Sequence, residues 1–263
     1  MNNVLKLREK LKSKFFVNYD MSQLSWFRSG GKATILIIVE NESELEIILQ
    51  SINHNPYYVI GSGSNLLVRD KGYDGIIIKL GKGFNKIQII EDKLTVGASI
   101  LDGNLSVFAK NHLISGFEFF SGIPGTIGGA VKMNAGCFGS ETSNMLKEII
   151  CFDQKGTKTK LDKDKIKLQY RSSSIKDTSI ITTAKFNIKY GKIEQINEKH
   201  RVIKKERQTK QPIKEKTSGS TFKNPNNQFA AKLIEEAGCK GLSIGDAIVS
   251  NIHSNFIINK KNA

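Results

Sequence analysis

The glycine-rich segment at residues 121–136, SGIPGTIGGAVKMNAG, constrains the fold of this chain more than any other part of its sequence. It holds five glycines and one proline in sixteen residues, and Phe119 and Phe120 precede it. Glycine lets a backbone approach a ligand closely and adopt positive φ without steric cost. The segment therefore predicts one of two structures. One is a surface whose main-chain N–H groups hold a diphosphate or the edge of a ring; the other is a turn followed by a tightly packed helix.

The composition predicts a globular protein with a substantial core and two or three subdomains, because 39% of the 263 residues are hydrophobic and 25% are charged. No run of 18 apolar residues occurs, and charges are spread through the first sixteen residues. We therefore expect neither a membrane helix nor a secretory signal. Cys137, Cys151 and Cys239 form no CxxC pair, which favours neither a metal site nor a disulfide framework. The expected setting is the reducing cytoplasm.

The formal net charge of +15 is compatible with a nucleic-acid partner and equally with an anionic small molecule. The densest basic segment, residues 199–216, contains no aromatic residue, so it offers no surface for base stacking. It is typical of the solvated face of a charged helix. We expect no nucleic-acid partner.

Hydrophobic periodicity predicts a mixture of strands and helices. A buried strand at residues 34–40, a helix at 42–53 and a strand at 57–60 form a βαβ-like unit that ends at Gly61, with Ser43 and Glu46 as a candidate capping box. Further strands are expected at residues 76–80, 86–90, 94–96, 147–152, 157–161 and 179–190. Further helices are expected at 101–112, 194–210 and 228–237, with a candidate linker at 207–217.

The strand that ends at Ile60 runs into GSGSNLLVRD, residues 61–70. A loop of glycine, serine and asparagine after a strand offers N–H groups and hydroxyls to a phosphate. It is not the dinucleotide-binding fingerprint, because Leu66 stands where GxGxxG has its third glycine and no helix pattern opens there. A plain hairpin loop is the alternative.

Three further motifs place a cation beside a small hydroxyl residue or a glycine. They are SWFRSGGKA at residues 25–33, YRSS at 170–173 and SGSTFKNP at 218–225. None forms a catalytic triad with a histidine, and the four histidines are scattered. We expect those histidines to be structural or exposed.

The order of the motifs FRSGG, GSGSNLLV, GIPGTIGGAVKMNAG, YRSS and GSTFKNP resembles the UDP-N-acetylenolpyruvoylglucosamine reductase (MurB) family of peptidoglycan enzymes. The resemblance runs from about residue 24 to residue 259 and fits the shorter form of the family. It implies an α+β fold, in which a two-part FAD-binding region of the vanillyl-alcohol-oxidase (PCMH) type precedes a small substrate-binding domain. The implied boundaries are residues 1–80 and 81–192 for the two FAD-binding subdomains. Residues 193–263 then form the connecting helix and the substrate-binding domain.

The resemblance also implies FAD as the cofactor. We expect FAD to be bound noncovalently, because no histidine or cysteine stands in a motif that would tether it. The expected FAD contacts, by position in the family motifs, are Arg28, Gly30, Gly61, Ser62, Gly63, Ser64, Asn65, Leu66, Gly122, Pro124, Gly125, Thr126, Ile127, Gly128, Gly129, Ala130 and Asn134.

The implied reaction uses NADPH to reduce FAD, after which hydride passes to the enolpyruvyl ether of UDP-N-acetylglucosamine and UDP-N-acetylmuramate is formed. Arg171 matches the family arginine that stabilises the enolate-like charge beside the substrate carboxylate. Ser220 matches the family proton donor. Tyr170, Lys223 and Asn224 are expected substrate contacts, and no metal is expected.

The family also carries a catalytic glutamate near its C-terminus, and no residue of this chain matches it. We therefore expect the chain to be truncated, which leaves open a flavin- and nucleotide-binding chain without turnover. Another flavin oxidoreductase, such as a small-alcohol oxidase, is disfavoured by the lack of a tethering residue. We expect a cytoplasmic monomer without a membrane partner.

Overall fold

The computed structural model describes residues 1–263 except the side chain of Asn2, and the chain divides into two compact units. Unit 1 comprises Met1–Tyr19, Ala33–Gly61 and Asp74–Ile203. Unit 2 comprises Asp20–Lys32, Ser62–Tyr73 and Lys204–Ala263. The chain therefore passes between the units several times. The three-part division implied by the family resemblance partitions the chain differently and stays a prediction.

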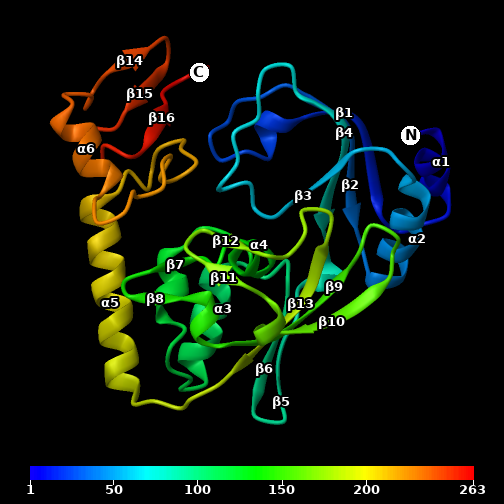
Figure 1. Ribbon diagram of the computed structural model, residues 1–263, viewed down its shortest axis with the longest axis horizontal. Helices are drawn as coiled ribbons and strands as arrows, with labels where there is room; N and C mark the ends of the chain where they lie inside the picture. Colours follow the sequence, from blue (N-terminus) through cyan, green and yellow to red (C-terminus); the bar gives the residue numbers. More distant parts are fainter. The chain divides into compact units, whose positions relative to one another are not determined.

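A four-stranded sheet begins the fold, with the strand order β1-β2-β4-β3 (Figure 1). Its strands are β1 (Lys14–Asp20), β2 (Lys32–Val39), β3 (Tyr57–Ile60) and β4 (Tyr73–Leu80). Strands β3 and β4 run parallel, and Ile60 lies opposite Lys79. This pairing brings the residue after Ile60 close to the end of β4.

Helix α2 (Glu42–Ile52) belongs to the same core as this sheet, because its residues Leu45, Ile48, Leu49 and Ile52 are buried together with strand residues. These are the four apolar positions whose spacing predicted the helix. Asn41 is the N-cap, and its side chain accepts a hydrogen bond from the N–H of Glu44. The predicted capping box at Ser43 is wrong, since the helix begins at Glu42.

A five-stranded antiparallel sheet forms the rest of the unit 1 framework, in the order β10-β9-β13-β6-β5. Its strands are β5 (Ile87–Ile90), β6 (Lys93–Gly97), β9 (Leu146–Phe152), β10 (Lys158–Asp162) and β13 (Ile180–Asn187). Helices α3 (Asp102–Asn111) and α4 (Ile127–Lys132) contribute to the same core, which is centred on buried phenylalanines such as Phe117, Phe120 and Phe186. The strands predicted at residues 147–152 and 157–161 are confirmed, and they pair with each other in an antiparallel hairpin.

Short elements complete unit 1. They are α1 (Asn2–Leu5), the strand pair β7 (Gly136–Cys137) and β8 (Ser140–Glu141), and the pair β11 (Leu168–Gln169) and β12 (Ser172–Ser173). The short 3-10 helices of both units are η1 (Lys6–Glu9), η2 (Met21–Gln23), η3 (Lys82–Phe84), η4 (Glu118–Gly122), η5 (Thr142–Asn144) and η6 (Lys163–Lys165).

Unit 2 contains the end of helix α5 (Ile193–Lys210), helix α6 (Ala230–Glu236) and a three-stranded antiparallel sheet. The strands are β14 (Ser243–Ile244), β15 (Ala247–Val249) and β16 (Ile257–Asn259). Asn259 Nδ2 donates to the carbonyl of Phe27 at 2.8 Å, which fastens the early segment of this unit to its last strand.

The structure combines helices with mostly antiparallel sheets, which agrees with the expected α+β class. Among the described residues, no helix combines the length and the apolar character needed to cross a bilayer. The same part of the chain contains no group of three or more His, Cys, Asp or Glu side chains arranged to hold a metal ion.

Candidate active site

The glycine-rich segment lies in unit 1, where it forms the end of η4, a loop and helix α4. The N–H of Ile127 donates to the Ile100 carbonyl, and the N–H of Gly128 donates to the Ala98 carbonyl, both at 2.9 Å. A Cβ on Gly128 would lie 3.1 Å from the Cβ of Ala98. Both N–H groups therefore donate to carbonyls of the chain itself. Of the two structures predicted for this segment, the start of α4 matches the second, a turn followed by a tightly packed helix. Contact between Gly128 and FAD stays a prediction.

The other side of this segment is open. Gly129 is exposed, and a Cβ on it would meet only Thr126 Oγ1, at 3.7 Å. Thr126 itself is buried, and the neighbouring Gly125 carbonyl accepts a hydrogen bond from the N–H of Asp102 at 3.1 Å. The segment therefore has one face fixed on the core and one glycine surface free for close approach.

Gly61 meets this segment within unit 1. A Cβ on Gly61 would overlap Thr126 Oγ1, so the two glycine-rich motifs are in contact only because residue 61 has no side chain. The Gly61 carbonyl accepts a hydrogen bond from Lys79 Nζ at the end of β4. Burial lowers the pKa of the Lys79 ammonium. The sequence reasoning did not single out Lys79, and only the parallel pairing of β3 and β4 reveals it.

The loop after Gly61 belongs to unit 2, where it packs on the segment that contains FRSGG. Gly63 has φ +76°, and a Cβ on it would overlap the Leu24 carbonyl oxygen. The Gly63 carbonyl accepts from the N–H of Trp26 at 3.1 Å. Ser62 Oγ donates to Ser64 Oγ at 3.2 Å, so two predicted phosphate-binding hydroxyls are neighbours. The remaining predicted contacts of this loop, Asn65 and Leu66, are exposed and partly buried, respectively.

Arg28 and Gly30 lie in the same part of unit 2. Gly30 has φ +119°, and a Cβ on it would overlap the side chain of Val68. Arg28 is exposed, and its Nη1 donates to the Gln23 carbonyl at 2.9 Å. Two sequence motifs, FRSGG and GSGSNLLV, are therefore brought together by backbone contacts that require glycine.

Arg171 lies in unit 1, at the turn between β11 and β12. It has φ +55°, its Nη2 donates to the Gly136 carbonyl at 3.1 Å, and its guanidinium carbon lies 5.4 Å from the centroid of the Tyr170 ring. Asn134 is 2% exposed and joins this turn to the glycine-rich segment, because its Nδ2 donates to the Gln169 carbonyl at 3.3 Å. The structure thus brings the YRSS motif next to the residues that follow α4.

Ser220 lies in unit 2 and is exposed. It forms an isolated bridge with Phe256, and the next residue, Thr221, donates its N–H to the Asn255 carbonyl at 2.8 Å. The Asn255 side chain accepts from the N–H of Phe222 and donates to the Phe222 carbonyl, each at 2.9 Å. Asn255 is 3% exposed and fixes the backbone of the SGSTFKNP motif. Sequence reasoning missed it, because a single asparagine in a loop carries no recognisable spacing.

The two predicted substrate contacts that follow Ser220 differ. Asn224 Oδ1 accepts the N–H of Ala230, the first residue of α6, at 3.0 Å, so this side chain already holds a helix start. Lys223 is exposed. Substrate contact by either residue stays a prediction.

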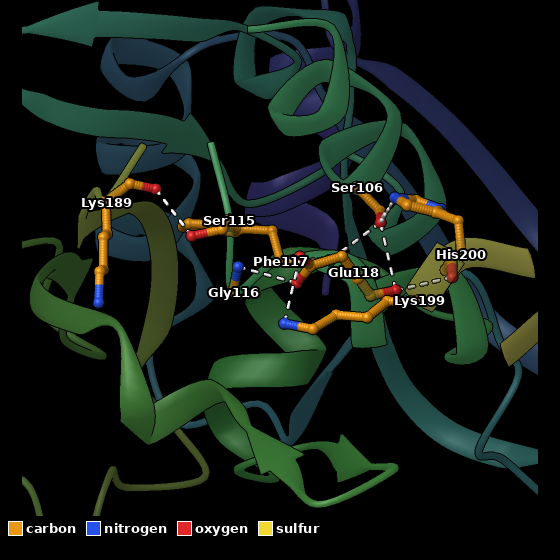
Figure 2. A network of polar contacts seen from close by, with 9 residues as sticks. Ser106, Ser115, Gly116, Phe117, Glu118, Lys189, Lys199 and His200 are labelled. Carbon is orange, nitrogen blue, oxygen red and sulfur yellow. Dashed lines mark hydrogen bonds and ion pairs between the residues drawn. The ribbon is translucent and has the colours of Figure 1, made fainter. Parts of the chain in front are cut away.

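A polar network stabilises η4, the element that leads into the glycine-rich segment (Figure 2). Ser106 Oγ, on α3, donates to the Phe117 carbonyl at 2.9 Å and lies 3.4 Å from Nε2 of His200, on α5. Glu118 Oε2 accepts the N–H of Gly116 at 2.8 Å, and Lys199 Nζ lies 3.6 Å from Glu118 Oε1. Burial lowers the pKa of His200. Side chains from α3, α5 and η4 thus hold the backbone that leads to Gly122.

Asp102, at the start of α3, contacts the Gly125–Thr126 turn through its backbone N–H, and its carboxyl group is buried. Its side chain is 1% exposed, and neither carboxyl oxygen has a hydrogen-bond partner among the described residues. Burial raises the pKa of this carboxyl well above its ordinary value. The group is therefore expected to be neutral rather than a charged ligand for a metal or a cation.

The comparisons with known proteins agree with this geometry. Residues 33–162 match a family profile described as an FAD binding domain, and residues 211–263 match the C-terminal domain of UDP-N-acetylenolpyruvoylglucosamine reductase. UDP-N-acetylenolpyruvoylglucosamine reductase of Rickettsia conorii is 40% identical over 254 residues, which are 96% of this chain and 86% of the relative.

Solved structures are similar as well. A reductase of that name from Thermus caldophilus superposes with a TM-score of 0.85 at 34% identity, covering 96% of this chain and 90% of its own. The 6-hydroxy-D-nicotine oxidase of Arthrobacter nicotinovorans gives a TM-score of 0.52 at 12% identity, over 68% of this chain and 43% of its own. This second likeness concerns the fold alone, and it supports the oxidase-type FAD-binding fold expected from the sequence.

Proposed function

This chain belongs to the UDP-N-acetylenolpyruvoylglucosamine reductase family, and we propose that it reduces UDP-N-acetylglucosamine enolpyruvate to UDP-N-acetylmuramate in peptidoglycan synthesis. The cofactor is FAD and the hydride donor is NADPH. The observation that carries the proposal is the 40% identity over 96% of the chain. A profile match confined to the FAD-binding domain would support a flavin oxidoreductase of many kinds.

The residues of the glycine-rich motifs fit a bound dinucleotide. Gly129 leaves an open backbone surface on unit 1, and Ser62 and Ser64 place two hydroxyls next to each other on unit 2. Backbone surfaces and hydroxyls of this kind suit a diphosphate and a flat ring. We propose that the FAD contacts are those expected from the sequence. The ones that belong to unit 1 are Gly61, Gly122, Pro124, Gly125, Thr126, Ile127, Gly128, Gly129, Ala130 and Asn134. Arg28, Gly30 and residues 62–66 are contributed by unit 2.

The chemistry that FAD would supply when bound is the transfer of hydride from NADPH to the enolpyruvyl group of the substrate. Addition of hydride leaves negative charge beside the substrate carboxylate, and a fixed cation lowers the energy of that state. We assign this role to Arg171. Its guanidinium has five N–H donors, and the Gly136 carbonyl fixes its direction through one terminal nitrogen. The remaining N–H donors lie in the plane of the guanidinium and can form a bidentate pair of hydrogen bonds with a carboxylate.

The carbon next to that carboxylate must then receive a proton, and we assign the donor role to the Ser220 hydroxyl. Serine is a weak acid, but a carbanion-like centre is a strong base, so a positioned hydroxyl suffices. The Asn255 side chain and backbone hold residues 221 and 222, which limits where the Ser220 hydroxyl can lie. Ser220 is exposed within its own unit, as a donor to an incoming substrate has to be.

No observation favours the alternative of a flavin-binding chain without turnover over enzymatic activity. The partners we propose are the UDP-sugar substrate and NADPH, for a cytoplasmic monomer without nucleic-acid or membrane partners. The three cysteines form no CxxC pair, which supports a reducing compartment.

The deciding experiment is steady-state oxidation of NADPH by the purified chain, with and without UDP-N-acetylglucosamine enolpyruvate. We expect oxidation that depends on this substrate and yields UDP-N-acetylmuramate by mass spectrometry. A chain that contains FAD but oxidises NADPH at the same rate without the substrate would contradict the proposed substrate. A chain that takes up no flavin would contradict the whole assignment.

A further inference from the structure

Lys79 is a charged residue that the motif series does not include and the proposed chemistry does not use. It is partly buried at the end of β4, directly opposite Ile60 in the parallel pair with β3. Its ammonium donates to the carbonyl of Gly61, the residue at which β3 gives way to the serine-containing loop. The position of this charge is therefore fixed by the strand pairing and by a backbone contact.

The charge of Lys79 is not balanced by protein. Among the described residues, no carboxylate lies within 4.0 Å of its Nζ, and burial lowers the pKa of the ammonium, which reflects an energetic cost of keeping it charged. Partly buried cations are normally paired with an anion. A single carbonyl uses one of the three N–H donors of the ammonium, so two donors remain.

Gly61 adds a geometric reason to look for an anion here. It touches Thr126 of the glycine-rich segment, and the next residues along the chain are Ser62, Gly63 and Ser64. The ammonium thus stands at the first residue of a loop whose composition suits phosphate oxygens. A lysine is a point charge that serves phosphate without requiring the planar geometry of arginine.

We propose that Lys79 binds the diphosphate of FAD, with one N–H held by the Gly61 carbonyl and the others donated to phosphate oxygens. This inference rests on the proposed function, because it takes FAD as the ligand. It makes Lys79 a specificity-determining residue, which favours FAD over flavins that lack the diphosphate.

The test is equilibrium dialysis of the full 263-residue chain against FAD and, separately, against riboflavin, which has the ring but no phosphate. Lys79→Met removes the charge and keeps most of the stem, and Lys79→Arg keeps the charge. Lys86→Met removes the same charge from an exposed position of unit 1 and is the matched control. We expect Lys79→Met to weaken FAD binding about 10- to 100-fold, the range for a hydrogen bond to a charged group, and to leave riboflavin binding nearly unchanged.

Lys79→Arg should retain most of the FAD affinity, and Lys86→Met should behave like the unsubstituted chain. Equal weakening of FAD and riboflavin by Lys79→Met would show that Lys79 only shapes the loop, and unchanged FAD binding would equally overturn the inference. If circular dichroism shows that Lys79→Met does not fold, Lys79→Gln replaces it in the same comparison. Absence of FAD binding by the unsubstituted chain would refute the proposed function itself, a result distinct from failure at Lys79.

Discussion

Single residues in this chain combine an assigned chemical role with a structural one, and the two can be separated experimentally. Arg171 adopts φ +55° and contacts the Gly136 carbonyl, so its side chain is held by the fold before any substrate arrives. Ser220, by contrast, is exposed, and its position is set through its neighbours. Substitution of Ser220 should therefore disturb the chemistry more than the fold.

The Ser220→Ala variant should separate the two half-reactions. Reduction of the bound flavin by NADPH should proceed at the normal rate, because the hydroxyl is assigned only to the protonation of the substrate. Reoxidation by the enolpyruvyl substrate should slow by about 10²–10⁴, the usual cost of losing a positioned acid. Stopped-flow absorbance of the flavin measures both rates. Equal slowing of the two half-reactions would mean that Ser220 has a structural role.

Asp102 should make the protein less stable as the pH rises. Burial raises its pKa in the folded state, so above the ordinary value of 3.8 the unfolded chain releases a proton that the folded chain retains. The contribution of this group to stability is thus full below pH 3.8 and is lost as the pH rises toward the folded-state pKa.

The Asp102→Asn variant keeps the shape and cannot ionise, so it should be more stable than the parent at pH 7 and nearly equal to it at pH 4. Urea unfolding at the two pH values measures this difference. A variant that is less stable at pH 7 would show that the carboxyl is charged and paired.

At the scale of elements, glycine matters here chiefly because backbones cross without room for a side chain. Gly63 combines φ +76° with an overlap between its missing Cβ and the Leu24 carbonyl. Gly139 has the same φ of +76° but no atom within 4 Å of its missing Cβ. Substitutions at Gly139 and Gly63 therefore separate two costs: Gly139 tests the left-handed backbone alone, and Gly63 tests the same backbone together with close packing.

Gly139→Ala should lower the free energy of unfolding by about 1–2 kcal/mol, the cost of a left-handed conformation for an L-residue. Gly63→Ala should lower it by several kcal/mol and should also reduce FAD uptake, because the loop must move away from Leu24. Urea unfolding and flavin content measure the two effects. Equal losses of stability in the two variants would mean that the loop at Gly63 relaxes freely.

Local sequence patterns predicted most elements of unit 1, because each strand and helix buries one apolar face. Helix α2 and strand β3 match their expected positions to within a residue. The predicted capping residue was wrong, since Asn41 and Ser43 are both good caps and only the packed structure selects between them. Lys79 and Asn255 could not be predicted, because their contacts join residues 18 and 33 positions apart.

The family resemblance predicted which segments carry the cofactor and substrate residues, but it did not predict what the glycines do. Gly128 is an expected FAD contact, and in the structure its N–H donates to the Ala98 carbonyl. A glycine pattern is the same whether the close neighbour is a ligand or the backbone of another segment. The residues assigned to FAD and to substrate accordingly remain proposals.

At the scale of the whole molecule, we expect the chain to hold its cofactor by noncovalent contacts. We expect precipitation of the purified yellow protein with trichloroacetic acid to release all the flavin into the supernatant, because none of the motif positions assigned to FAD contact is a cysteine or histidine. Absorbance of supernatant and pellet measures the distribution. Colour that stays with the pellet would reveal a covalent bond and contradict this expectation.

The passage of the chain between two units bears on how the protein is made. The Phe27 carbonyl receives its hydrogen bond from Asn259, which is 232 residues later. A ribosome that adds about 5–20 residues per second needs on the order of ten to fifty seconds to cover that distance. Residues 20–32 and 62–73 therefore leave the ribosome long before the rest of unit 2 exists. During that interval these two segments, which include the serine loop assigned to FAD, can pack on each other but lack the partners that residues 204–263 supply.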